Sequence, residues 1–215
     1  MAQTVRQLVG LQGLGPSSVD ATGAEGMFLV LVRNSWDSIQ NSRKKWKWLR
    51  TEGSFNTVVG TGTYMITTIF SPTNRFKRWY EDTFMITVAG KKSPMRFIEY
   101  DVFRDRYANA TTNTRPYEFT IRPRDSAILI APSDAVYVIT ADYHKTNQTL
   151  ALAADIPELP VDYHMLIVYE AANRYAISIA MSGLYQEYKQ LYNEMWGNLL
   201  RDQLPKEIFK VSGIA

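Results

Sequence analysis

The interval between apolar residues changes twice along this 215-residue chain, and that change restricts the fold more than any other feature. From Glu25 to Leu49 the interval is helical, which predicts one long helix with one buried stripe. The stripe consists of Phe28, Val32, Trp36, Ile39 and Trp46. From Gly53 to about Tyr143 the interval is two, as in half-buried strands, and helical spacing returns near Asp162. The order helix, strands, helix predicts an α+β fold.

The central block is expected to contain about six to eight short strands. Residues 54–67, SFNTVVGTGTYMIT, predict a hairpin with Gly60 and Gly62 in its turn. Further strands are predicted within residues 82–90, 95–103, 117–123, 127–132 and 136–144. Prolines lie between or at the ends of several of these segments, where they interrupt strand pairing. The simplest arrangement is an antiparallel β-sandwich or a partial barrel.

The C-terminal part predicts a pair of antiparallel helices. Helical spacing runs from Asp162 to about Leu204, with a break at Ser182-Gly183, and Pro205 ends the second helix. A short helix is also predicted from Thr4 to Leu11. The predicted organisation is a discontinuous helical domain (1–50 and 158–205), an inserted β-rich domain (51–157) and a C-terminal docking tail (206–215).

The segment Ser42–Gly53, SRKKWKWLRTEG, combines five cationic side chains with two tryptophans. If the long helix continues through it, Trp46 lies on the buried stripe. Trp48, about 200° further round the helix, then faces away from Trp46 and toward a domain or subunit boundary. Cations are favoured in the last turn of a helix because they complement its dipole. The alternative is a nucleic-acid-binding module that uses the basic segments 43–50 and 75–78.

Charge is unevenly distributed along the chain. Residues 1–124 contain 18 basic and 10 acidic side chains, whereas residues 125–215 contain 6 basic and 11 acidic ones. This asymmetry indicates either an anionic partner for the basic half or contacts between the basic part of one copy and the acidic part of the next.

Residue types that commonly carry catalysis are scarce. The chain has no cysteine and two histidines, His144 and His164, each within an Asp-Tyr-His triplet. The first triplet falls on a predicted strand and the second on a predicted helix, so the two cannot present the same geometry. No serine lies in a nucleophile elbow, and no phosphate loop or metal motif is present. We therefore expect no enzyme activity, no metal and no cofactor. No run of about 18 apolar residues predicts a transmembrane helix.

The last residues, after the helix-ending proline, are unexpectedly apolar. The sequence PKEIFKVSGIA contains Ile208, Phe209, Val211 and Ile214, and Leu204 comes just before it. These side chains either pack on their own domain or dock onto a partner as an extended segment.

Taken together, several segments resemble the head-to-tail adaptor proteins of tailed bacteriophages. The resemblance covers nearly the whole chain and consists of packing and turn residues. The segments are W-x-x-I-Q (36–40), WKWLR (46–50), SFNTVVGTGTY (54–64), RFKRWYEDTF (75–84), FIEYDVFR (97–104), RPYEFTI (115–121), LPVDYHMLIVYEAANRYA (159–176) and RDQLP (201–205).

This resemblance implies a structural virion protein, located at the head–tail junction and assembled in the host cytoplasm. It implies a homo-oligomeric ring of about twelve copies under the portal protein. Such a ring extends the DNA channel without sequence-specific DNA binding and provides the docking surface for the downstream tail or nozzle protein. No membrane contact is implied.

The candidate site residues follow from this implied role. Portal contacts are expected from Leu204, Ile208, Phe209, Val211 and Ile214. Subunit or channel contacts are expected from Arg43, Lys44, Lys45, Lys47, Trp48, Arg75, Lys77 and Arg78.

Overall fold

The computed structural model describes residues 1–11, 22–107, 112–152 and 155–204, which separate into two compact units. The helical unit contains the described residues of the stretches 1–49 and 147–204. The β unit contains the described residues of 50–146. Helices and largely antiparallel sheets occur together, which confirms the predicted α+β class.

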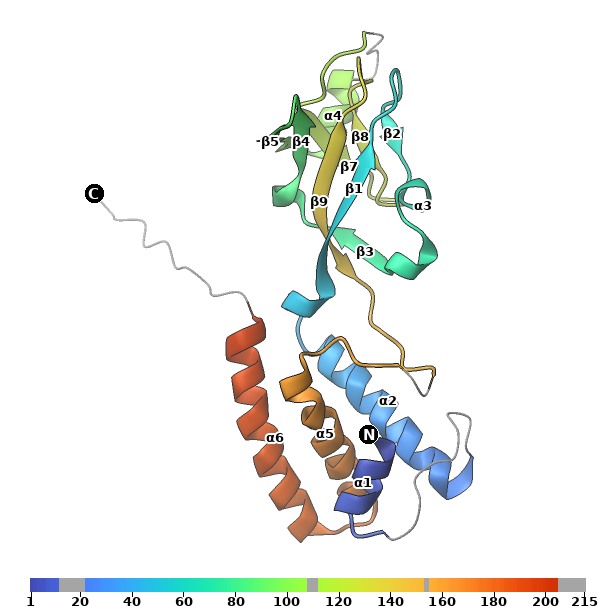
Figure 1. The fold of residues 1–215 in the computed structure, drawn as a ribbon, viewed down its shortest axis with the longest axis vertical. Helices are drawn as coiled ribbons and strands as arrows, with labels where there is room; N and C mark the ends of the chain where they lie inside the picture. Colours follow the sequence, from blue (N-terminus) through green and yellow to red (C-terminus); the bar gives the residue numbers. More distant parts are fainter. Residues whose placement is uncertain (12–21, 108–111, 153–154, 205–215) are drawn as a thin grey trace, which may run out of the picture. The chain divides into compact units, whose positions relative to one another are not determined.

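The helical unit is built from four helices and two single 3₁₀ turns among its described residues (Figure 1). They are α1 (Ala2–Leu8), α2 (Gly23–Asn41), η1 (Lys47–Leu49), η4 (Val161–Tyr163), α5 (His164–Ser178) and α6 (Ser182–Gln203). Helices α5 and α6 run side by side, joined by a short connection before Ser182. The predicted helix pair is therefore confirmed, and its break lies at residues 179–181, just before the Ser182-Gly183 pair that begins α6.

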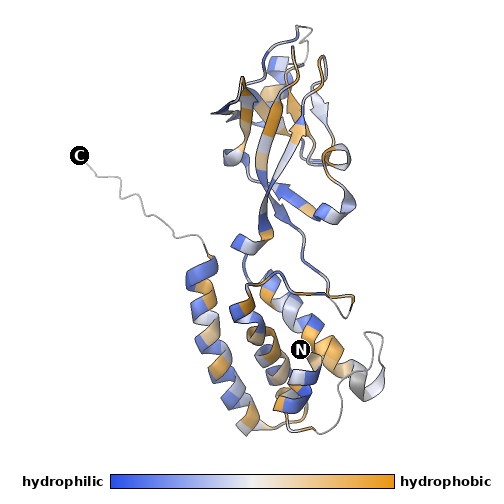
Figure 2. Ribbon diagram, viewed as in Figure 1, coloured by the Kyte–Doolittle hydropathy of each residue, from blue (hydrophilic) through white to orange (hydrophobic). Residues whose placement is uncertain are grey.

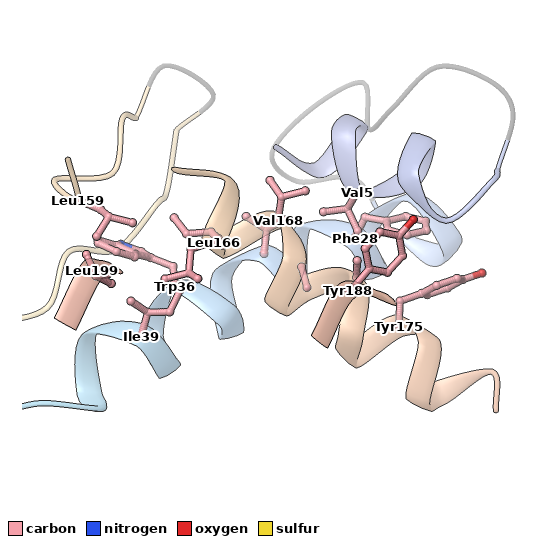
Figure 3. Close-up of a cluster of buried hydrophobic side chains, with 14 of the residues drawn as sticks. Val5, Phe28, Trp36, Ile39, Leu159, Leu166, Val168, Tyr175, Tyr188 and Leu199 are labelled. Atoms are coloured by element: carbon pink, nitrogen blue, oxygen red, sulfur yellow. The ribbon is translucent and has the colours of Figure 1, made fainter. Parts of the chain in front are cut away.

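The core of the helical unit is a continuous apolar cluster between these helices (Figure 3). The predicted stripe of α2 is buried as far as Ile39, and Trp36 is 1% exposed. Phe28 packs against Tyr175 of α5 with ring centroids 5.3 Å apart. Helix α1 joins this core through the buried Val5. Burial of this stripe removes large apolar area from water, which stabilises the packed helices.

The β unit contains two sheets among its described residues. The first has the order β1-β9-β4-β5, with β3 also paired to β9, and the second has the order β2-β8-β7-β6. The strands are β1 (Arg50–Asn56), β2 (Thr63–Tyr64), β3 (Phe76–Trp79), β4 (Met85–Val88), β5 (Lys91–Pro94), β6 (Arg96–Phe97), β7 (Glu118–Ile121), β8 (Ile128–Ile130) and β9 (Val138–Lys145). The helical segments are α3 (Ile66–Ile69), α4 (Tyr100–Tyr107) and the 3₁₀ turns Pro72–Asn74 and Glu81–Thr83.

Strand β9 organises the first sheet because it pairs with β1, β3 and β4. Its antiparallel register with β1 runs from Arg50 opposite His144 to Asn56 opposite Val138. One apolar cluster draws side chains from both sheets. Phe84, which precedes β4, stacks on Phe119 of β7 with centroids 3.9 Å apart. The two sheets therefore share a core. Among the described strands, β6 and β7 pair in parallel and the other pairs are antiparallel, and isolated parallel bridges join Val59 and Thr114 to Ser133.

The predicted hairpin over residues 54–67 is wrong, because its two strands belong to different sheets. Strand β1 pairs with β9, whereas β2 pairs with β8. Gly60 has the expected turn conformation, with φ at 75°. Gly62 is needed for a different reason: a Cβ there would lie 2.8 Å from the carbonyl oxygen of Ile130.

Two further predictions for the β unit need correction. Residues 95–103 do not form one strand, because β6 ends at Phe97 and α4 begins at Tyr100. An acidic residue in the first turn of α4 and two arginines in its last turn complement the helix dipole. Strands β3 and β5 were not predicted, because their Lys and Arg side chains obscure the apolar alternation.

Hydropathy along the ribbon shows how α6 meets the core (Figure 2). Hydrophobic and hydrophilic residues alternate along this helix, so one side packs inward and the other faces solvent. Within the described ranges, no helix combines the length and apolar composition that crossing a bilayer requires.

Candidate functional site

The basic tryptophan segment forms a compact hook, residues 42–49, rather than the end of a long helix. Helix α2 stops at Asn41, so the predicted extension to Leu49 is wrong. The reason lies in the hydrogen bonds at the helix end. The indole Nε1–H of Trp46 donates to the carbonyl oxygens of Ile39 and Gln40, at 3.2 and 3.1 Å. Trp46 therefore adds a donor at the end of α2, where the Ile39 carbonyl also accepts from the N–H and the hydroxyl of Ser42.

The hook also caps a second helix. The ammonium of Lys47 donates to the carbonyl oxygen of Asp202, at 2.5 Å, in the last turn of α6. A cation is favoured at this end of a helix dipole. Lys47 thus has a contact within its own unit, alongside any role at a subunit boundary or channel.

Trp46 is fully buried, as predicted, but Trp48 does not face away from it. The two indoles stack with centroids 4.2 Å apart, and Trp196 of α6 meets Trp46 edge-on at 5.8 Å. The helical phase that separated the two tryptophans does not apply, because the hook is not an α-helix. Trp48 is half-buried and packs against the core of its own unit.

The remaining cations of the hook extend from the surface. Arg43, Lys44 and Lys45 are exposed, and Arg43 donates to the carbonyl oxygen of Ser42 at 2.8 Å. Lys45 directly precedes the buried Trp46 in the chain. The hook therefore presents three adjacent cations on a backbone that is held by its tryptophan anchor.

The second predicted basic segment belongs to the β unit. Lys77 and Arg78 lie on β3, and Arg75 precedes it in a left-handed conformation with φ at 52°. Arg78 lies 5.6 Å from the ring centroid of Tyr80. The hook and this segment are therefore in different units, each with its own surroundings.

The Tyr80 ring also carries a second guanidinium. Arg50 lies 4.7 Å from its centroid and forms an ion pair of 2.5 Å with Asp142. Half of the Arg50 side chain is exposed, so this pair contributes little to stability. The carboxylate partly neutralises the cations here, which weakens the case for a strong phosphate site.

The predicted portal-contact residues lie mostly outside the described residues. Ile208, Phe209, Val211 and Ile214 belong to the stretch 205–215. Leu204 is described: it is half-buried, packs against the helical core and donates its N–H to the carbonyl oxygen of Leu200.

Each histidine lies close to a backbone carbonyl oxygen. His144 is buried on β9, and its Nδ1 lies 2.6 Å from the carbonyl oxygen of Lys145. His164 begins α5, with its Nε2 2.8 Å from the carbonyl oxygen of Leu159. No group of three or more acidic or histidine side chains could hold a metal ion within the described ranges.

One polar cluster was missed by the sequence analysis. The carboxylate of Glu118 on β7 is 2% exposed and accepts hydrogen bonds from Arg106 at 2.6 and 2.7 Å and from Tyr107 at 2.9 Å. Arg96 adds an ion pair at 3.7 Å. Burial opposes ionisation, but these donors and positive charges still hold the pKa of Glu118 below its ordinary value. The cluster joins α4 to β7 and has a structural role.

A comparison with known protein families shows to which class of protein the hook and the other exposed surfaces belong. A family model described as the SU10 adaptor protein matches residues 1–207, a range that includes every described residue of both units. The chain belongs to the SU10 adaptor protein family. No curated protein matches the chain.

Membership of this phage head–tail adaptor family confirms the resemblance drawn from the sequence. The chain is a structural component of a bacteriophage virion. An adaptor role implies contacts with portal and tail proteins and between copies, and it implies no reaction. The hook and the exposed faces of the helical unit are thus candidate assembly surfaces.

Proposed function

We propose that this adaptor forms a ring of about twelve copies directly under the portal. The ring extends the channel through which DNA passes and provides the docking surface for the next tail or nozzle protein. The observation that carries the proposal is the family match over residues 1–207, which spans both the helical unit and the β unit. Two units of unlike architecture provide unlike surfaces for two different neighbours.

The helical unit is assigned to the portal side and the β unit to the tail side or to the neighbouring copy. Portal contacts come from Leu204 and from Ile208, Phe209, Val211 and Ile214 of the tail. The hook cations and Arg75, Lys77 and Arg78 lie at subunit boundaries or along the channel. Their attraction to DNA is limited to weak, sequence-independent contacts with phosphates, because DNA must slide past them.

The mechanism is ordered assembly without covalent chemistry. A complete portal offers repeated docking sites, so an adaptor that binds beside a bound copy contacts the portal and that copy together, which increases its affinity. The finished ring then presents a repeated surface to the tail. No cofactor and no catalytic residue takes part.

The experiment is co-sedimentation of the purified adaptor with portal rings. The full-length chain is expected to sediment with the portal, and a chain lacking residues 206–215 is expected to lose most of this binding. Circular dichroism checks that the shortened chain is folded. Undiminished binding by the shortened chain would remove the tail from the portal interface. A full-length chain that binds DNA as a monomer but never binds portal would favour the nucleic-acid alternative.

A further inference from the structure

A groove lies along α6, on the side that meets η4 and α5. Its floor is apolar and aromatic, formed by the half-buried Tyr163, Tyr169, Leu191 and Met195. These side chains pack inward against the helical core but keep one face open. The floor is therefore a partly apolar surface to which a long side chain can add contact.

The rim of this groove is acidic. Asp162, Glu194 and Asp202 line it with exposed carboxylates, and Arg201 is the one cation of its lining. Burial raises the pKa of Tyr163, and the negative charges of Asp202 and Asp162 raise it further. The carboxylates of Asp162 and Asp202 outnumber the one cation, Arg201, at this end of the groove, so its net charge is negative. The groove thus fits a cationic segment with aliphatic stems.

The tryptophans of the hook contact a different side of the same helix. Trp46 meets Trp196, which stacks on Tyr192 at 5.6 Å. On an ideal helix, the row of Tyr192 and Trp196 is displaced by about 100° from the row of Leu191 and Met195. The tryptophans of the hook and the acidic groove therefore flank α6 on separate sides, and Lys47 of the hook reaches the end of the groove at the carbonyl oxygen of Asp202.

We propose that the groove of one adaptor copy binds the basic hook of the next copy in the ring. This inference rests on the proposed ring. A head-to-tail contact requires two complementary patches at different places on the same molecule, and hook and groove meet this requirement. Arg43, Lys44 and Lys45 supply the charge opposite to that of the rim. Their aliphatic stems cover the apolar floor, and Tyr163 and Tyr169 offer ring faces to the ammonium groups.

Charge reversal in the full-length chain tests this pairing. The hook variant carries Lys44→Glu and Lys45→Glu, and the groove variant carries Asp162→Lys and Glu194→Lys. All four side chains are exposed, so both variants are expected to fold. Each variant alone is expected to form roughly tenfold fewer complete rings on portal particles, because like charges then face each other. Electron microscopy of portal–adaptor particles counts the rings.

Mixing the two variants gives the decisive result. The reversed hook of the first variant matches the reversed groove of the second, and the native hook of the second matches the native groove of the first. An equimolar mixture is therefore expected to restore rings of alternating variants. Asp37→Lys on α2 and Lys189→Glu on α6 serve as controls, since both are exposed charges outside the hook and the groove lining. These controls are expected to assemble like the wild type.

Three outcomes would overturn the pairing. Normal rings from either variant alone would show that hook and groove do not meet between copies. Failure of the mixture to restore rings would show that each reversal acts on some other contact. Normal rings that no longer bind portal or tail would assign the groove to a different protein. In all three cases the wild-type rings remain, so the proposed function stands. Absence of wild-type rings would overturn both.

Discussion

The indole of Trp48 stacks on the indole of Trp46, with ring centroids 4.2 Å apart and planes inclined by 23°. Trp46 in turn donates its Nε1–H to the carbonyl oxygens of Ile39 and Gln40 in the last turn of α2. The pair therefore holds the hook against the end of a helix. In the assembly account, this anchoring fixes the positions of the neighbouring cations before any other copy binds, which lowers the entropic cost of binding.

Removing the side chain of Trp46 is expected to lower the free energy of unfolding much more than removing that of Trp48. Trp46→Ala deletes a fully buried indole and its two hydrogen bonds to α2, so we expect a loss of about 3–5 kcal/mol in the free energy of unfolding. Trp48→Ala is expected to cost about 1–2 kcal/mol, because its ring is half-buried. Denaturant unfolding of both single variants and the double variant measures these losses.

The double variant also measures the stacking itself. We expect a coupling energy of about 0.5–1.5 kcal/mol between the two rings. Trp48→Phe is the matched control. It keeps an aromatic ring and removes an indole N–H that is buried without an acceptor among the described residues. A coupling energy of zero would mean that the two rings do not stack in solution.

Gly62→Ala is expected to destabilise the β unit by about 1–3 kcal/mol. A Cβ at this position would lie 2.8 Å from the backbone oxygen of Ile130, which cannot move without disturbing β8. Gly197→Ala is the control, because its Cβ would meet nothing within 4 Å and alanine favours the helix. The control is expected to be neutral or slightly stabilising. Equal melting temperatures for Gly62→Ala and the wild type would contradict this close approach.

Protonation of Glu118 is expected to weaken the β unit in acid. Its pKa in the folded protein is lower than in the unfolded chain, where it is about 4.3. The stabilisation is therefore fully present above about pH 5 and is lost as the pH falls through the unfolded and then the folded pKa. Glu118→Gln is expected to remove this contribution to the free energy of unfolding, about 1–3 kcal/mol at neutral pH, because the carboxylate is buried and hydrogen-bonded.

Unfolding curves of both proteins between pH 7 and pH 3 provide the test for Glu118. Other carboxyl groups titrate in the wild type and the variant alike, so the difference between the curves reports on this side chain. That difference is expected to shrink as the pH falls. A difference that stays constant over the whole range would show that the ionisation of Glu118 contributes nothing.

The histidines are expected to be dispensable for assembly. His144→Ala together with His164→Gln removes both imidazoles, whose ring nitrogens lie close to backbone carbonyls of Lys145 and Leu159. Stability is expected to fall modestly, with portal binding retained. Complementation of a phage that lacks this adaptor measures the outcome in infectious particles. If the particles formed completely, with DNA and tails, but could not infect cells, this result would support a chemical role for the two histidines.

Periodicity predicted the parts of the fold that depend on one repeating interval. The stripe of α2 up to Ile39, the pair α5 and α6, and the strands near Phe119, Ile128 and Ile139 follow from the spacing of apolar residues. In each of these elements the apolar side chains face the core of their own unit at a regular interval. The local sequence is therefore enough to predict the element. The match to a phage adaptor family was also accessible from sequence segments.

The wrong or missing predictions concern residues whose surroundings are set by contacts with residues distant in the sequence. Trp46 was predicted to be buried, but its burial depends on a turn back onto α2 that helical spacing does not encode. Gly62 was assigned to a hairpin, whereas its neighbour is Ile130 in a strand far along the chain. The ion pair of Glu118 likewise joins elements whose meeting depends on the whole sheet. The spacing of apolar residues in the sequence does not predict any of these contacts.

Electron microscopy of the purified adaptor bound to portal particles is the sharpest test of the proposed ring. We expect an additional ring of adaptor, coaxial with the portal and with an open channel along its axis. Portal particles incubated with the full-length chain and found bare, with the adaptor remaining as a free monomer, would contradict it.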